Sequence, residues 1–127
     1  MSEVDQPYAI PMDPDDAFDA VSNSRRRRVI LSVARVDGAI TASDLAVEIA
    51  AIENRIEPSR VNSEQRTRVY ISLTQRHLDT LDDLGVIAYD PRSKEARPND
   101  ITEALAEAVR RVETACYLPD SEERDAE

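Results

Sequence analysis

Four polar side chains near the middle of the chain have a spacing that suits recognition of nucleic acid. They lie at positions i, i+4, i+7 and i+8 and are Arg68, Ser72, Gln75 and Arg76. On a helix of about 100° per residue, this spacing places them along one strip. Arginine can bind guanine edges through two hydrogen bonds, glutamine can bind adenine edges, and serine can bind a base or a phosphate. The strip therefore predicts contact with bases or phosphates of duplex DNA, with a solvated helix face as the alternative.

Other cationic residues extend this prediction along the chain. Four consecutive arginines occupy residues 25–28, at the start of a predicted helix, where the helix dipole disfavours positive charge. DNA phosphate could compensate this charge, and so could the aspartates just upstream, which are Asp13, Asp15, Asp16 and Asp19. A predicted turn carries the only lysine of the chain. We expect DNA contacts from Arg25, Arg26, Arg66, Arg68, Ser72, Gln75, Arg76, Arg92 and Lys94.

The chain lacks the residues that the common catalytic and metal sites require. It has one histidine, His77, one cysteine, Cys116, and two glycines. A zinc site needs several nitrogen or sulfur ligands, and a phosphate-binding loop needs several glycines. We therefore expect no enzyme activity, no metal and no cofactor. His77 falls among the apolar positions of a predicted helix, so we expect a packed, hydrogen-bonded side chain.

The charge of the chain is negative overall and positive in the middle. Asp and Glu number 26 against 16 basic residues, and all but one of the basic residues are arginine. Residues 1–21 have a net charge of −6, residues 22–78 of +4 and residues 79–127 of −8. A basic centre in an acidic chain indicates an anion-binding surface, and nucleic acid is the obvious anion. The acidic, lysine-poor composition favours a halophilic source, although an ordinary acidic protein also fits.

The polar strip lies on a long helix predicted over residues 63–84. Its buried stripe is expected to be Tyr70, Leu73, His77, Leu81 and Leu84. The second half carries three aspartates that would repel phosphate, so we expect DNA contact only in the first half. Gly85 ends the helix, and residues 86–89 and 95–97 then form a β-hairpin.

The remaining elements are also helical. Helices are predicted over residues 14–21, from a break at 22–24 to residue 36, and over 42–54, with a very short strand at 39–40. Phe18 and Ile52 are expected in the core. A last helix, residues 100–118, has an apolar seam with heptad-like spacing, which comprises Ile101, Leu105, Ala108, Val112 and Ala115. This seam should pair two copies of the chain or pack on its own domain.

This order of elements predicts four regions along the chain. Residues 1–12 should be a mobile arm, and residues 13–98 a single domain. The last helix, with its flanks, occupies residues 99–118. Residues 119–127 are strongly acidic, and we expect a disordered tail.

Three segments resemble winged helix-turn-helix regulators of bacteria and archaea. SNSRRRRVIL (residues 22–31) is similar to the opening of their second helix, and ITASDLA (residues 40–46) to the start of the first helix of their helix-turn-helix. HLDTLDDLGVI (residues 77–87) is similar to the end of their recognition helix where it enters the wing. The chain also resembles a family of small, largely uncharacterised haloarchaeal winged-helix proteins, over about residues 17–97.

The resemblance implies a mainly α fold with a small β-hairpin, that is, a winged helix-turn-helix with an added C-terminal helix. It also implies a halophilic archaeal source and a regulator of transcription that binds double-stranded DNA, with the long helix in the major groove and the hairpin, the wing, on the backbone. Residues 53–62 replace the usual tight turn between the two helices, which leaves open which turn of the long helix meets DNA. A winged helix that binds proteins without binding DNA is the alternative.

The sequence shows no segment suited to a membrane. It contains neither an 18-residue apolar run nor an N-terminal basic segment followed by an apolar one. We therefore expect a cytoplasmic protein without a membrane partner. The expected partners are double-stranded DNA and a second copy of the chain, bound through the C-terminal helix.

Overall fold

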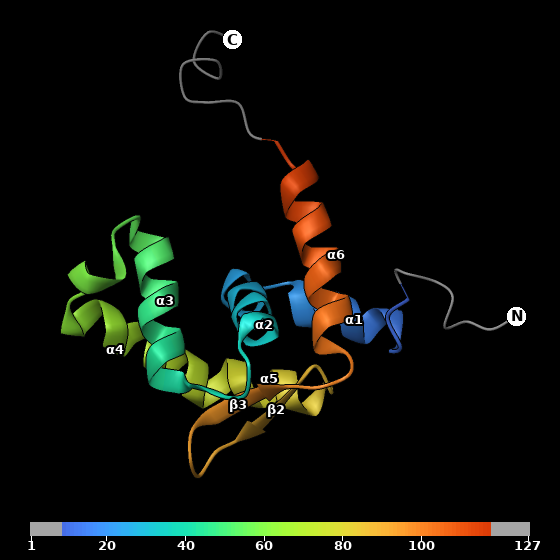
Figure 1. The fold of residues 1–127 in the computed structure, drawn as a ribbon, viewed down its shortest axis with the longest axis horizontal. Coiled ribbons are helices and arrows are strands. Elements are labelled where there is room, and N and C mark those ends of the chain that lie inside the picture. The colour runs from blue at the N-terminus through green and yellow to red at the C-terminus, as the bar shows by residue number, and fades with distance from the viewer. Residues whose placement is uncertain (1–8, 118–127) are drawn as a thin grey trace, which may run out of the picture.

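The fold is mainly helical with one small antiparallel sheet, in agreement with the predicted class (Figure 1). The helices are α1 (Pro14–Val21), α2 (Ser24–Arg35), α3 (Ala42–Asn54), α4 (Ser63–Ser72), α5 (Leu78–Asp83) and α6 (Thr102–Ala115). The strands are β1 (Ile40–Thr41), β2 (Ile87–Asp90) and β3 (Glu95–Pro98). A single 3₁₀ turn, Pro58–Arg60, lies in the described connection between α3 and α4.

The computed structural model describes residues 9–117. Within the segment predicted as a mobile arm, Ile10 and Met12 are partly buried and pack against the core. The first eight residues of that arm and the predicted acidic tail, residues 119–127, lie outside the described residues. None of the helices within residues 9–117 has the length and apolar character needed to cross a membrane.

Local sequence sets where two helices begin. Asp13 accepts a hydrogen bond from the Asp15 N–H at 2.8 Å, and Pro14 occupies the first position of α1. The long helix starts with a reciprocal cap, in which Asn62 accepts from the Gln65 N–H at 2.8 Å and Gln65 accepts from the Asn62 N–H at 3.0 Å. These caps are set by local sequence, and both helices begin at the residues that the sequence predicts, Pro14 and Ser63.

The three strands form one sheet in the order β1–β3–β2. β2 and β3 form the predicted hairpin, with Tyr89 opposite Ala96. β1 pairs with the other edge of β3, with Ile40 opposite Ala96, and leads directly into α3. Each strand is displaced or extended by one residue relative to its prediction.

The long helix is continuous, but it is not a regular α-helix. Between α4 and α5 it contains a π-helical turn, Leu73–His77, closed by a hydrogen bond from the Leu78 N–H to the Leu73 carbonyl. The predicted stripe residues Leu73, His77 and Leu81 are buried, as expected. The wider turn also brings Leu78 into the core with no exposed surface, which the regular 3.6-residue period does not predict.

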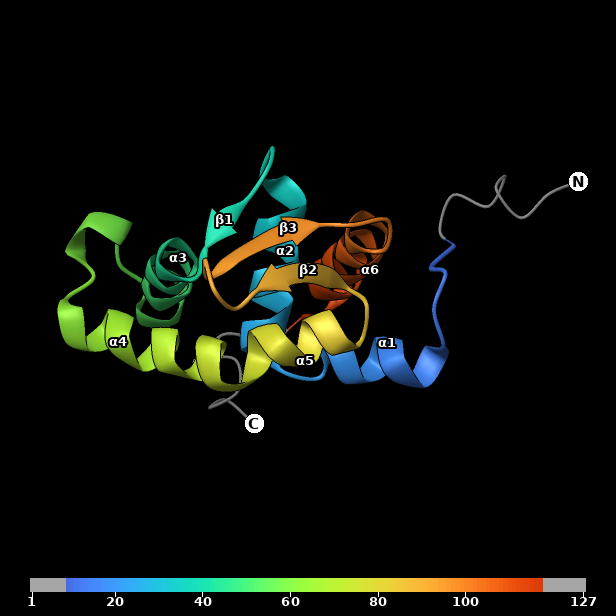
Figure 2. The ribbon, with the colours of Figure 1, turned by 90° about the horizontal axis from the view of Figure 1, so that it is seen from below.

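The core surrounds α2, which packs against α1, α3 and α6 (Figures 1 and 2). Its largest fully buried side chains include Ile30, Leu45 and Ile49. Two predicted core residues are wrong, because Phe18 is 72% exposed and Ile52 is 54% exposed. α1 turns the fully buried Ala20 toward the core, which leaves Phe18 on the opposite side. Ile52 lies in the last turns of α3, where the neighbouring elements are α4 and the loop before it.

The predicted seam of α6 is divided between the core and the surface. Leu105 is 2% exposed, and Ala106 and Val109 beside it are also buried, so the first half of α6 packs on its own domain. Val112 is 61% exposed and Ala115 is exposed, while Ile101 and Ala108 are partly buried. Of the two alternatives, packing on its own domain applies to the first half of the seam, and pairing of two copies stays a prediction for the exposed half.

Candidate nucleic-acid interface

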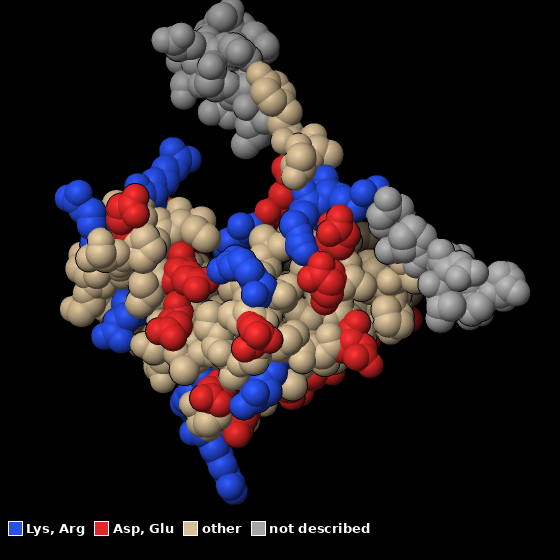
Figure 3. All heavy atoms as spheres, in the orientation of Figure 1, with Lys and Arg blue, Asp and Glu red and all other residues tan. Residues whose placement is uncertain are grey.

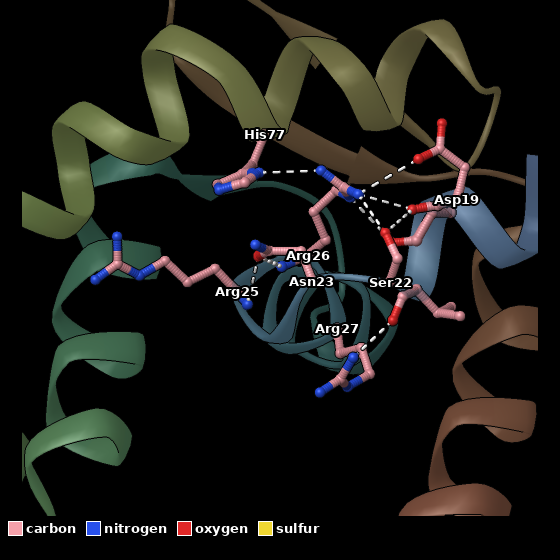
Figure 4. Close-up of polar contacts among 9 residues, drawn as sticks. Asp19, Ser22, Asn23, Arg25, Arg26, Arg27 and His77 are labelled. Carbon is pink, nitrogen blue, oxygen red and sulfur yellow. Dashed lines mark hydrogen bonds and ion pairs between the residues drawn. The ribbon is translucent and has the colours of Figure 1, made fainter.

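Arg26 is buried between α1 and the long helix (Figure 4). Only 8% of the residue is exposed, and its guanidinium donates to two carbonyl oxygens of α1, those of Asp19 at 2.8 Å and Ala20 at 3.3 Å. It also donates to the Ser22 hydroxyl at 2.8 Å, and its Nη1 lies 3.3 Å from His77 Nδ1. Because these partners use its donors inside the fold, the predicted DNA contact does not fit Arg26.

His77 is the acceptor at one end of this network. It is 4% exposed, which agrees with the packed, hydrogen-bonded residue that the sequence predicts. Burial, followed by the positive charge of Arg26, lowers the pKa of His77 to about 4. The ring is therefore neutral at pH 7, and because Arg26 faces Nδ1, the proton lies on Nε2.

The other arginines at the start of α2 bind carboxylates from distant parts of the chain. Arg25 donates two hydrogen bonds to Glu53 at the end of α3, at 2.7 and 2.9 Å. Arg27 donates to Glu113 of α6 at 3.1 Å, and Arg28 donates to the same carboxylate. Burial would raise the pKa of Glu113, but the hydrogen bonds and charges of both arginines outweigh burial and lower it.

The charge of the arginine run is compensated within the fold, mostly by carboxylates that the sequence does not point to. Of the upstream aspartates, Asp19 forms an ion pair, at 3.5 Å from Arg26. Glu53 and Glu113 compensate the rest of the run, and neither lies near it in sequence. The arginine run therefore ties α2 to four other helices, which are α1, α3, the long helix and α6.

The predicted strip of the long helix lies on α4 and the π-helical turn. Arg68 is exposed and forms an ion pair with Glu64 at 2.8 Å. Ser72 is partly buried at the end of α4, whereas Gln75 and Arg76 are exposed and belong to the π-helical turn. An exposed ion pair contributes at most about 1 kcal/mol, so it leaves Arg68 available to a stronger anion.

The turn of the hairpin, residues 91–94, lies against the start of α3. The Lys94 carbonyl accepts a hydrogen bond from the Ala42 N–H at 2.8 Å. Arg66 of α4 reaches the same place, because its Nη1 lies 3.4 Å from the Ser43 hydroxyl. The N-terminal part of α4 and the hairpin turn, far apart in sequence, therefore converge on adjacent residues at the start of α3.

Several cations on the elements around α3 have no ion pair among the described residues. Within residues 9–117, no ion pair of 4.0 Å or less involves Arg55, Arg60, Arg66, Arg76, Arg92 or Lys94. We call these six residues the basic surface. They lie on the α3–α4 loop, the long helix and the hairpin turn, and Figure 3 shows basic side chains projecting from this end and from the hairpin.

Arg55 and Arg60 belong to the basic surface but are absent from the predicted contacts. The sequence places them in a spacer without helical periodicity, so no face could be assigned to them. One signal was present: Arg55 directly follows the last residue of α3, a position that glycine or asparagine usually fills.

An apolar groove of about 760 Å³ lies at the opposite end of the molecule, between α1 and α6. Its walls include Met12, the exposed Phe18, the exposed Val112 and Cys116, with Arg27 at its edge. Val112, in the exposed half of the predicted α6 seam, therefore lines an apolar groove whose other wall is formed by residues of α1, among them Phe18.

Neither the curated proteins nor the solved structures contain a match to this chain. One family model, described as a domain of unknown function, DUF7344, matches residues 18–97. The match extends from α1 to β3, so it contains the arginine run, the strip and the whole basic surface, and it stops before α6. Because the match covers more than half of the chain, the protein belongs to the DUF7344 family.

Proposed function

We propose that the protein binds double-stranded DNA and regulates transcription as a winged helix-turn-helix. The order helix, strand, two helices, hairpin and the sheet order β1–β3–β2 support this proposal. In it, α3 and the long helix are the two helices of the motif, and the β2–β3 hairpin is the wing. The observation that carries the proposal is the convergence of Arg66 and the hairpin turn on the start of α3, within the basic surface.

The distribution of charge supports an anionic partner for this surface. The chain carries 26 acidic residues, ten more than its basic residues, so an arginine placed at random would easily find a carboxylate. Arginines on α2 and α6 do find one. The six cations of the basic surface have no carboxylate within 4.0 Å among residues 9–117, and Arg66 and Lys94 contact only neutral oxygens, those of Ser43 and Pro91. A row of phosphates could bind these cations with release of counterions.

The contacts divide into two kinds by residue type and position. Arg68, Gln75 and Arg76 project from the long helix and would face base edges in the major groove, with Ser72 beside them. Arg66, Arg92 and Lys94 would bind phosphates and set the orientation of the helix. Arg25 and Arg26 are left out of the proposed interface, because Glu53 binds one and the core encloses the other.

Binding to a pool of genomic duplex fragments tests the proposal directly. Fragments retained by the wild-type protein should be enriched in particular sequences, and the double variant Arg66→Gln/Lys94→Gln should bind at least tenfold more weakly. The control is Arg35→Gln/Arg110→Gln, which removes the same charge from residues that already have carboxylate partners elsewhere. Wild-type protein that retains no duplex above background would overturn the proposal.

A module that binds another protein is the second candidate. Two exposed apolar side chains, Ile52 of α3 and Ile71 of α4, favour it, since a surface that reads DNA has less need of them. This candidate expects Ile52→Ser/Ile71→Ser to abolish capture of a protein partner while Arg66→Gln/Lys94→Gln leaves it unchanged. The DNA-binding proposal expects the reverse pattern for retention of duplex.

Dimerisation belongs to the same proposal, with a reduced set of residues. A two-fold pairing would suit the symmetry of most regulatory DNA sites. The exposed Val112 and Ala115 of α6, with the partly buried Ala108 and with Phe18 across the groove, supply the apolar surface for it. Leu105 and Ile101 act in the core of one protomer instead.

A further inference from the structure

The connection between α3 and α4 has an unusual backbone at Arg55. This residue ends α3 with φ 57° and ψ 47°, in the left-handed region. Its N–H still closes the helix by donating toward the carbonyls of Ala51 and Ile52. Side chains with a Cβ are disfavoured in this conformation, and glycine or asparagine is the usual choice. This chain has an arginine at that position, and its side chain is exposed.

The loop that carries Arg55 is held by its own hydrogen bonds. The Ile56 N–H donates to the Ala51 carbonyl at 3.1 Å, and the Arg60 N–H donates to the Glu57 carbonyl at 2.9 Å. Pro58 begins the 3₁₀ turn, Pro58–Arg60, and restricts the backbone further. The two arginines therefore project from a backbone that is already ordered, which reduces the entropy lost when they bind.

Arg55 and Arg60 both line one shallow pocket of about 440 Å³, which Ile56 and Glu57 complete. Glu57 is a carboxylate close at hand, yet neither arginine lies within 4.0 Å of it or of any other carboxylate among residues 9–117. Arg55 and Arg60 are both exposed. Two exposed guanidinium groups at one concave site suit a phosphate, which arginine binds through paired hydrogen bonds.

We propose that Arg55 and Arg60 form a clamp for a backbone phosphate of the DNA duplex, beside the groove contacts of the long helix. This inference rests on the proposed function. The loop leads directly into α4, so the clamp lies at the same end of the molecule as Arg66 and Arg68. It adds affinity without reading sequence, because phosphates are the same at every base pair. The long spacer between α3 and α4 thereby has a function of its own.

The salt dependence of DNA binding tests the clamp. The logarithm of the binding constant falls with the logarithm of salt concentration, and each lost phosphate contact makes this slope shallower by about 1. Arg55→Gln/Arg60→Gln should therefore bind the genomic duplex pool with a slope shallower by about one unit, and should enrich the same sequences as the wild type. The control Arg35→Gln/Arg110→Gln should keep the wild-type slope.

Two substitutions of Arg55 separate charge from folding. Arg55→Gly removes the cation and also suits the positive φ, so the variant should melt at or above the wild-type temperature while it binds DNA more weakly. Arg55→Lys keeps the charge and should bind more tightly than Arg55→Gly. Equal DNA binding by the wild type and Arg55→Gly would assign Arg55 a backbone role alone and would overturn the clamp.

The outcomes distinguish the clamp from the proposed function. If the wild-type protein binds no duplex, the proposed function fails and the clamp fails with it. If the wild type binds and Arg55→Gln/Arg60→Gln keeps its slope, the clamp alone fails. Calorimetric titration with inorganic phosphate covers the other source of the anion: saturable binding that the double variant loses, without any change in the DNA slope, would assign the site to a free anion.

Discussion

Arg26 shows how one side chain can hold three helices together. It satisfies two carbonyls at the end of α1 and the ring of His77 on the long helix, and it is itself part of α2. A buried cation is costly unless its donors are used, and here they are used by neutral acceptors and by the nearby Asp19 carboxylate. The sequence marks Arg26 only as one of four adjacent arginines, so neither its burial nor its partners could be predicted.

Replacing Arg26 by leucine should destabilise the fold strongly. The substitution removes the Arg26 donor from the Ala20 carbonyl and from the Nδ1 of His77, which should cost about 3 kcal/mol of unfolding free energy. Arg35→Leu removes an exposed arginine of the same helix and should change this free energy by about 0.5 kcal/mol or less. Urea denaturation followed by circular dichroism measures both. Equal midpoints for the two variants would contradict the structural role of Arg26.

The pKa of His77 makes stability depend on pH. Folding lowers this pKa from 6.5 to about 4, so between these values the unfolded chain binds the proton that the folded chain excludes. Stability should therefore be fully present above pH 6.5 and be lost as the pH falls, by about 2 kcal/mol between pH 7 and pH 5. The chain has one histidine, so His77→Gln should remove most of this dependence. A wild-type stability that stays level over this range would contradict the assignment.

Among the elements, the long helix shows how far periodicity can predict burial. The stripe at Leu73, His77 and Leu81 follows from a 3.6-residue period, and the structure confirms it. The burial of Leu78 is not predicted by this period, because the π-helical turn adds a residue to one turn and rotates every later side chain about the helix axis. The residues within this turn have ordinary helical propensities, so the sequence does not mark it. The face that carries Gln75 and Arg76 is set by the same turn.

The proposed strip and the hairpin should respond differently to substitution. Gln75→Ala should weaken binding to the preferred sequence by about 1–3 kcal/mol and relax the preference at one position, because a base contact is lost. Lys94→Ala should weaken binding to every sequence alike and make the salt slope shallower. Selection from a random duplex library, repeated with each variant, compares the two effects. If Gln75→Ala selects the same DNA sequences as the wild type, Gln75 does not contact a base.

Substitutions in the two halves of α6 should have different effects on folding and on oligomeric state. Val112→Glu places a charge on the exposed half, so the protein should stay folded and sediment as a monomer if this half pairs protomers. Thr114→Glu adds the same charge at an exposed residue that does not border the groove, and should leave the mass unchanged. Leu105→Glu should unfold the domain, because its side chain is buried. Equal masses for the wild type and Val112→Glu would contradict dimerisation through this surface.

For the whole molecule, the order of elements could be predicted better than their contacts. Caps such as Asn62 with Gln65, and breakers such as Gly85, act locally, so the helix limits and the hairpin could be predicted from the sequence. The exposure of Phe18 depends on how α1 lies against α2, which no local pattern contains. The same holds for Arg25 with Glu53 and for Arg28 with Glu113, pairs that are 28 and 85 residues apart. Distant pairing of this kind decides which cations remain for a ligand.

The arginine run at the start of α2 has a mechanical consequence. Within little more than one turn, this helix is tied to α1, to Glu53 of α3, to His77 of the long helix and to Glu113 of α6. Tightly packed helices move as rigid bodies and do not bend to absorb a displacement. A ligand or partner that changed the tilt of α6 at the apolar groove would therefore also displace α2, through the contacts of Arg27 and Arg28 with Glu113. On its other side α2 packs against α3 and the long helix, and the loop between these two helices carries part of the basic surface.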